Sequence, residues 1–202
     1  MSELRDLKIE GMGSCYGGVY NRVKLEGMST IKDNLKCNSF SSEGMCKCEG
    51  QIEAEDMNIE GTFKGIGSIR AKKFNAEGYI KVKNCPINAD EISLEGFMTC
   101  GELSADIIDI DGVCHAEKIF GESIKINPSI NIKSVFNLFF KSSNISKAEL
   151  IECTELKANA LTANIIRASR VELGKDCEVN VVEYSETADI HPNAKVKNLT
   201  KI

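Results

Sequence analysis

The hydrophobic and polar residues of the chain recur in a unit of about 17 residues. A glycine preceded by an acidic residue recurs along the first half, and the steps between successive glycines are 16, 17, 17, 17, 18 and 16 residues. These glycines are Gly11, Gly27, Gly44, Gly61, Gly78, Gly96 and Gly112. One step further on, Asn127 and Pro128 occupy the places of the acid and the glycine. Repetition at such a period is typical of solenoid proteins.

Each unit contains three short groups of apolar residues that alternate with polar ones. The groups stand just before the glycine, about four residues after it, and seven to eleven residues after it. Around Gly96 they are Ile92 and Leu94, then Cys100, then Leu103 and Ala105. Alternation with a period of two predicts half-buried β-strands. Hairpin strands would be longer, so three short strands separated by turns in about 17 residues predict one coil of a parallel β-helix.

Stacked coils would place the apolar positions in an interior core. In a parallel β-helix each coil pairs with the coils above and below it. Equivalent residues therefore form columns in which successive residues lie about 4.8 Å apart. The length of 202 residues predicts about twelve coils and a rod roughly 55 Å long. We expect the core to include Ile59, Ile69, Ile92, Leu94, Leu103, Ile108 and Ile110.

The acidic residue before each glycine would form a column of like charges. Its members are Glu10, Glu26, Glu43, Glu60, Glu77, Glu95 and Asp111. In water, two unit charges about 4.8 Å apart repel each other by roughly 0.9 kcal/mol, so the column must face solvent. We interpret it as a solubilising stripe. The alternative is a stripe that binds divalent cations or a basic partner.

The repeat continues along the chain with one interruption. We interpret residues 1–132 as N-terminal coils, residues 133–147 as a loop or insertion, and residues 148–202 as C-terminal coils of the same solenoid. After the interruption, apolar pairs recur every five residues, close to one third of a coil, which predicts the same three-sided winding. These pairs are Leu156/Ala158, Leu161/Ala163, Ile166/Ala168 and Val171/Leu173.

Composition and charge narrow the classes of function. The net charge of −5 is spread along the chain, which argues against a nucleic-acid partner. No apolar run is as long as a membrane-spanning helix, and the first residues do not form a signal peptide, so we expect a cytoplasmic protein. Nine cysteines without a secretory signal argue against a disulfide framework. Cys15, Cys48 and Cys100 share one core position, where cysteine acts as a small hydrophobic residue.

Catalytic and metal-binding patterns are weak in this sequence. The closest candidates for metal ligands are Cys46/Cys48 and Cys114/His115, and neither has a second pair at zinc-finger spacing. His191 lies in the turn-like stretch "IHPNA". There is no glycine-rich phosphate loop and no pairing of a nucleophile with a base. We therefore expect no enzymatic activity, no cofactor and no metal.

The irregular coils and the closing run of the chain resemble bactofilins, the polymer-forming cytoskeletal proteins of bacteria. The chain resembles especially the two-part versions found in Bacillus and Clostridium relatives. The most specific pieces are "VEY" at residues 182–184 and Gly-x-x-Cys at residues 174–177. The resemblance covers nearly the whole chain, but the Pro-rich tail of the better-known members is absent. It implies a right-handed β-helix that assembles end to end, without nucleotide, into filaments that scaffold cell shape, envelope or motility structures.

The ends of the predicted solenoid point to the same kind of assembly. Each end of a β-helix exposes unpaired backbone N–H and C=O groups, which soluble solenoids cover with polar or helical caps. Neither end of this sequence contains a cap pattern, so the chain itself is the expected partner. The candidate polymerisation residues are Leu4, Leu7 and Ile9 at one end and Ile190, Val196 and Leu199 at the other.

Two other classes of function fit parts of the sequence. The stretch "KANALTANIIRAS" and the negative charge suggest a pentapeptide-repeat-like DNA mimic, but the five-residue pattern lasts only a few units. A left-handed β-helix acyltransferase would need a stricter six-residue period and a catalytic histidine. A discrete dimer would favour the DNA mimic, a discrete trimer the acyltransferase, and a broad polymer distribution the filament.

The densest aromatic cluster lies in the interruption. It consists of Phe136, Leu138, Phe139 and Phe140, flanked by Lys133, Lys141 and Lys147. One interpretation is that these side chains pack on the rod. The other is an exposed apolar loop that enters the membrane interface or binds an envelope or motility protein, which would make the protein membrane-associated.

Flotation with liposomes tests the membrane interpretation. If the cluster enters the interface, the protein should float with anionic liposomes at low salt, because each flanking lysine contributes up to about 1 kcal/mol near such a surface. A variant with all four apolar residues changed to Ser should stay at the bottom of the gradient. Equal flotation of both proteins, or none of the wild type, would leave the packing interpretation.

Overall fold

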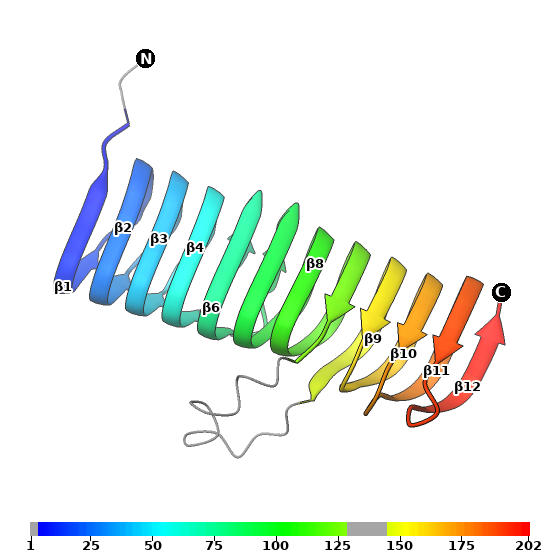
Figure 1. Cartoon of the computed structure of the whole chain (residues 1–202). Helices are drawn as coiled ribbons and strands as arrows, with labels where there is room; N and C mark the ends of the chain where they lie inside the picture. The colour runs from blue at the N-terminus through cyan, green and yellow to red at the C-terminus, as the bar shows by residue number, and fades with distance from the viewer. Residues whose placement is uncertain (1–3, 129–144) are drawn as a thin grey trace.

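The chain winds into a right-handed parallel β-helix (Figure 1). The computed structural model describes residues 4–128 and 145–202, and within these ranges it contains β-strands and no α-helix. About 11 turns of about 17 residues follow one another along a rod. The fold class predicted from the repeat is therefore confirmed.

Twelve strands among the described residues form one continuous sheet that winds around the rod. The N-terminal strands are β1 (Leu7–Cys15), β2 (Gly18–Ile31), β3 (Leu35–Cys48), β4 (Ile52–Gly65), β5 (Ile69–Arg70), β6 (Lys73–Val82), β7 (Pro86–Asn88) and β8 (Glu91–Ile126). The C-terminal strands are β9 (Ser146–Ala158), β10 (Leu161–Leu173), β11 (Glu178–Ile190) and β12 (Lys195–Lys201). Neighbouring strands pair in parallel, as coils that lie on one another must.

The register of the strands aligns the repeat as the sequence predicts. Gly11 pairs with Gly27, Gly27 with Gly44, and the same column continues through Gly61 and Gly78. The residues on either side of the glycines are aligned in the same way. The positions around the repeat glycines are therefore aligned from coil to coil along the N-terminal part of the rod, whereas the register shifts once between β10 and β11, after Ala168.

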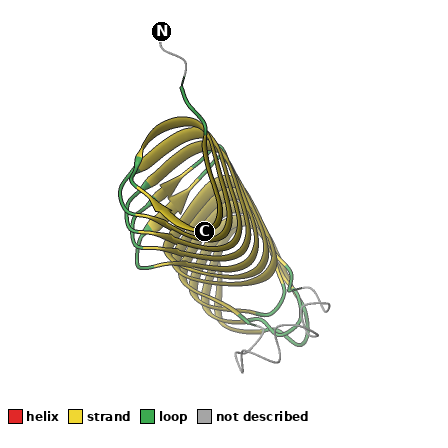
Figure 2. Cartoon of the chain, turned by 90° about the vertical axis from the view of Figure 1, so that its left-hand side faces the viewer, coloured by secondary structure: helices red, strands yellow, loops and turns green. Residues whose placement is uncertain are grey.

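The coils stack behind one another around a common axis (Figure 2). The buried apolar side chains form one cluster along the rod. The predicted core residues Ile59, Ile69, Ile92, Leu94, Leu103, Ile108 and Ile110 are all at most 2% exposed. Phe40 and Phe63 meet edge to face with ring centroids 6.5 Å apart. The apolar pairs of the C-terminal coils are buried as well, so both halves share one core.

The repeat glycines make a bend that other residues would strain. Six of them have a positive φ, from +81° at Gly11 to +124° at Gly96, a region that favours glycine. Space is a second constraint, because a Cβ built on Gly78 would lie 2.2 Å from the carbonyl oxygen of Gly61. At Gly11, in the first coil, such a Cβ would meet nothing within 4 Å. Conformation and close stacking therefore both require glycine inside the rod.

The two strands that flank the interruption lie on adjacent coils. β8 pairs directly with β9, with His115 beside Lys147 and Ile124 beside Leu156. The buried Ser146 hydroxyl accepts a hydrogen bond from the Cys114 N–H at 3.1 Å. This direct pairing explains why the rod has about 11 turns and not the twelve expected from length alone. β9 begins at Ser146, so Ser146 and Lys147, which the prediction placed at the end of the insertion, lie in a strand.

Two glycine substitutions separate the conformational from the steric constraint. Gly11→Ala should lower the free energy of unfolding by about 1–3 kcal/mol, the usual cost of a strained φ. Gly78→Ala should cost the same plus about 1–3 kcal/mol for the overlap with the Gly61 carbonyl. Denaturation followed by circular dichroism measures both. Equal losses of stability would contradict the close-stacking argument.

Candidate functional site

The two ends of the rod are where the sheet and the core lack a covering coil. Among the described strands, β1 pairs only with β2 and β12 pairs only with β11. The outer edges of β1 and β12 therefore expose backbone groups without a strand partner in residues 4–128 and 145–202. Such edges pair readily with strands of another chain.

The N-terminal end presents the first layer of the core. Leu7 and Ile9 occupy the same columns as Val23 and Leu25, which are buried. Leu7 and Ile9 are only half-buried, because no described coil covers their outer side. Leu4 precedes β1 and is 45% exposed. The three residues predicted for this end thus lie at it, with Leu7 and Ile9 in the core columns.

The C-terminal end presents the last layer of the core in the same way. Leu199 lies in the column of Val182, and it is 49% exposed whereas Val182 is fully buried. Val196 covers Val179 and is half-buried, and so is Ile190 at the end of β11. The residues predicted for this end therefore also lie in terminal core columns. About 11 turns at about 4.8 Å separate the two ends by roughly 50 Å.

The flank of the N-terminal coils carries the predicted column of acids. Glu10, Glu26, Glu43, Glu60, Glu77 and Glu95 are aligned one above another by the strand register. We call this column the acid ladder. Lys24 lies 2.6 Å from Glu26 and lowers its pKa through a hydrogen bond, and Lys8 pairs with Glu10. The prediction that the ladder lies on the outer surface is confirmed.

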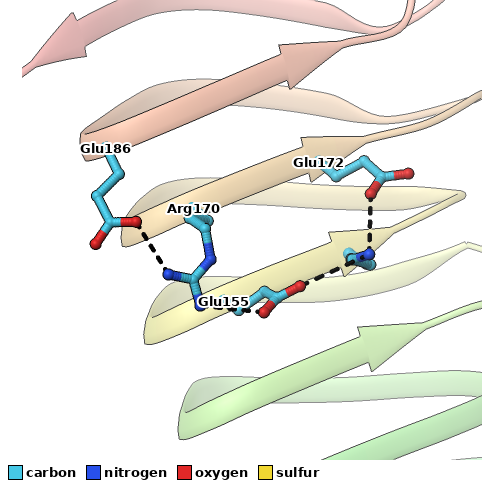
Figure 3. A network of polar contacts seen from close by, with 5 residues as sticks. Glu155, Arg170, Glu172 and Glu186 are labelled. Carbon is cyan, nitrogen blue, oxygen red and sulfur yellow. Dashed lines mark hydrogen bonds and ion pairs between the residues drawn. The ribbon is translucent and has the colours of Figure 1, made fainter.

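The flank of the C-terminal coils alternates in charge. Arg170 lies 3.2 Å from Glu155 on one coil and 2.9 Å from Glu186 on the next (Figure 3). Lys157 joins the same network through Glu155 and Glu172, at 3.6 and 3.4 Å. Arg167 bridges Glu152 and Glu183, at 2.9 and 2.7 Å. Stacking therefore brings opposite charges together here, in contrast to the acid ladder.

The cysteines lie in the hydrophobic core or pack against it. All nine are free thiols, and burial raises the pKa of Cys48 and Cys153 to about 12. A thiol with such a pKa is protonated at neutral pH and is a poor nucleophile. Cys48 and Cys100 are buried at the core position predicted for them, and Cys15 is half-buried. Within residues 4–128 and 145–202, no three His, Cys, Asp or Glu side chains gather as metal ligands.

The two histidines make structural contacts with backbone groups and an aromatic ring. The Nε2 atom of His115 lies 3.2 Å from the carbonyl oxygen of Ile145, so this contact joins the two sides of the interruption. The His115 ring also packs edge to face on Phe97, with centroids 5.1 Å apart. His191 lies at a turn, where its Nδ1 accepts a hydrogen bond from the Asn193 N–H at 3.0 Å.

Comparison with known proteins gives no match: no family model, no curated protein and no solved structure is similar to this chain. Among the described residues, no helix is long and apolar enough to span a membrane. The function is therefore argued from the surfaces of the rod alone.

The sequence analysis did not predict one exposed column of methionines. Met12, Met28 and Met45, each directly after a repeat glycine, are exposed in one column. Comparing the residue after each glycine would have revealed this column. The predicted membrane or partner cluster, Phe136, Leu138, Phe139 and Phe140, lies outside the described residues and stays a prediction.

The stability of the protein should depend on the protonation of His115. Burial lowers the pKa of His115, so the unfolded chain binds this proton more readily than the folded chain. Stability should therefore rise with pH until it levels off near pH 6.5, the ordinary histidine pKa, and the loss should be complete below the folded-state pKa. Melting temperatures of wild type and His115→Asn across this window should differ in slope. His191→Asn is the control, and an unchanged slope in His115→Asn would contradict the prediction.

Proposed function

We propose that the protein is a bactofilin-type filament subunit that assembles end to end without nucleotide or cofactor. The observation that carries this proposal is the uncovered core at both ends of the rod. Leu199 is half exposed in a column whose next member, Val182, is fully buried. Val182 is covered by β12, whereas no described strand covers the outer side of Leu199.

The physical gain from end-to-end contact resembles the gain from adding one more coil. A second copy laid on an end would remove the side chains of Leu7 and Ile9, or of Val196 and Leu199, from water. It would also pair the free edges of β1 and β12. Burial of an aliphatic side chain contributes about 1.5–3 kcal/mol, and backbone pairing gives the contact direction.

The rest of the rod suits a scaffold. The flanks present exposed ion pairs and ladders, and the pKa of the deeply buried thiols is too high for nucleophilic chemistry. We propose that filaments of this chain lie in the cytoplasm and organise envelope, shape or motility machinery. The resemblance of the coils and of the closing run to bactofilins supports this role.

A second candidate function is that of an acidic DNA mimic. The observation in its favour is the acid ladder, in which six carboxylates stand in line on the surface. The C-terminal coils argue against it, because Arg167 and Arg170 neutralise the acids beside them. Only part of the rod could therefore imitate a nucleic-acid backbone.

Charges placed at the ends should abolish polymerisation. We expect wild type to sediment at high speed and to form filaments in negative-stain micrographs. Leu7→Lys and Leu199→Lys should each block one end, because a lysine cannot be buried in a core contact without a partner. Ile107→Lys is the matched control, since Ile107 is also about half exposed (51%) but lies away from both ends, in β8.

The products of the single variants distinguish two ways of joining. A filament built head to tail should fall to monomers with either change, whereas a filament joined through like ends should stop at dimers. Circular dichroism must show the β-sheet spectrum of wild type for each variant. Unchanged polymers in both folded variants, or a wild type that remains a discrete dimer or trimer, would contradict the proposed function.

A further inference from the structure

One flank of the rod carries apolar side chains that the core does not use. The residues directly after the repeat glycines stack in one outward column, which we call the apolar stripe. It consists of Met12, Met28, Met45, Thr62, Tyr79 and Phe97. The three methionines are 79%, 48% and 52% exposed. Tyr79 and Phe97 are half-buried and stack with ring centroids 5.5 Å apart.

Charged columns of opposite sign flank the apolar stripe. The acid ladder stands two residues before each stripe residue, and a lysine column of Lys47, Lys64 and Lys81 stands two residues after it. Within residues 4–128 and 145–202, no ion pair involves Glu43, Glu60, Glu77, Lys64 or Lys81. In the three coils that contain Met45, Thr62 and Tyr79 the order across this flank is therefore negative, apolar, positive. Lys47 also pairs with Glu49 of its own chain, and the places two residues after Met12, Met28 and Phe97 hold Ser14, Thr30 and Thr99.

This order makes the flank complementary to itself in only one of two symmetric arrangements. Two copies can meet stripe to stripe about a two-fold axis that runs along the rods or across them. An axis along the rods places Glu60 of one copy opposite Lys64 of the other, because the rotation exchanges the two sides of the stripe. An axis across the rods does not exchange the two sides of the stripe, so the acid ladder of one copy faces the acid ladder of the other. Repulsion between like charges disfavours this arrangement.

We propose that the apolar stripe is a lateral contact between two copies of this chain whose rods run in the same direction. The methionines of the two copies pack on each other, and the acid ladder of each copy faces the lysine column of the other. Symmetric pairing of one patch with itself is the usual form of a two-fold interface. Methionine suits such a surface because its flexible side chain adapts to a partner.

Charge selects a second copy over a membrane as the occupant. An apolar stripe beside six aligned carboxylates would be repelled by anionic lipids, since the ladder lies along its whole length. A second copy supplies the missing cations through Lys64 and Lys81. The other copy also brings its own apolar stripe, so that both apolar columns leave water together.

The small size of the stripe makes the contact depend on polymerisation, so this inference rests on the proposed function. From Met12 to Phe97 the stripe is about 24 Å long, and from ladder to lysine column about 13 Å wide. Two copies would therefore cover about 600 Å², against about 1,200–2,000 Å² for a stable interface. Single rods should not pair measurably, whereas filaments that repeat the contact many times should.

Two centrifugation steps separate the two levels of assembly. A high-speed spin pellets filaments and a low-speed spin pellets only laterally associated filaments, and negative-stain micrographs count single and paired ones. We expect wild type in both pellets at low salt, and increasing salt should empty the low-speed pellet first, because exposed charges are screened.

Two variants remove the lateral contact by different means. Met28→Thr with Met45→Thr replaces two methionines by the residue that the chain itself has at Thr62 in the same column. Lys64→Glu with Lys81→Glu places acids opposite the acid ladder. Both should abolish the low-speed pellet and leave the high-speed pellet unchanged.

Two further variants serve as control and rescue. Arg70→Glu with Lys118→Glu makes the same change of net charge at exposed positions away from the stripe and should associate like wild type. Adding Glu60→Lys and Glu77→Lys to the Lys64→Glu/Lys81→Glu chain exchanges the two columns, so it should restore the low-speed pellet. Rods running in opposite directions would predict no loss in Lys64→Glu/Lys81→Glu, because like columns would face each other before and after.

The outcomes distinguish failure of this inference from failure of the proposed function. An empty high-speed pellet of wild type would contradict polymerisation itself and, with it, this contact. Filaments that stay single, or that pair equally well after the methionine and lysine changes, would overturn the lateral contact alone. Liposome flotation that is lost in Met28→Thr/Met45→Thr would assign the stripe to a membrane and overturn it as well.

Discussion

The contact on which the structure depends is the approach of each repeat glycine to the backbone of the coil before it. A Cβ on Gly27, Gly61 or Gly96 would lie within 2.4 Å of a carbonyl oxygen in the preceding coil. Coils that stack this closely cannot slip by a residue, because a slip would exchange inward and outward side chains. Residues at the same position of the repeat therefore stack in one column, and the core, the acid ladder and the methionines each form such columns.

The fold could be predicted from the sequence because the stacking of equivalent residues requires a repeat that is visible in the sequence. A period of about 17 and the alternation of apolar residues predict the coil, and Ile59 and Leu103 are buried as expected. The direct pairing of Ile124 with Leu156 could not be predicted, because it depends on residues 32 positions apart. The place of Leu199 at an end of the rod was predicted from the lack of a cap pattern, and Leu199 is 49% exposed in a column where Val182 is fully buried.

The two halves of the rod solve the problem of stacked charges differently. In the C-terminal coils an arginine such as Arg170 stands between acids of the coils on either side, so stacking is favourable (Figure 3). In the N-terminal coils Glu43, Glu60 and Glu77 stack on one another, and the repulsion is left to solvent and to partners. Lys8 and Lys24 pair with Glu10 and Glu26, but no ion pair of the described residues compensates Glu60 and Glu77, so stacking them costs stability. In the proposed lateral contact, these acids would favour a partner that presents lysines beside its own apolar residues.

Ends and flanks of the rod differ in how strongly they can hold another copy. At an end, a partner meets core side chains and unpaired strand edges together, so contact there resembles the pairing of two coils within the chain. On the flank, a partner meets only a narrow stripe whose backbone is already paired. In the proposed assembly, growth along the axis should therefore precede association between filaments, and the acid ladder should then set the relative direction of neighbours. A charge pattern too weak to hold two molecules can still orient two filaments, because every subunit repeats it.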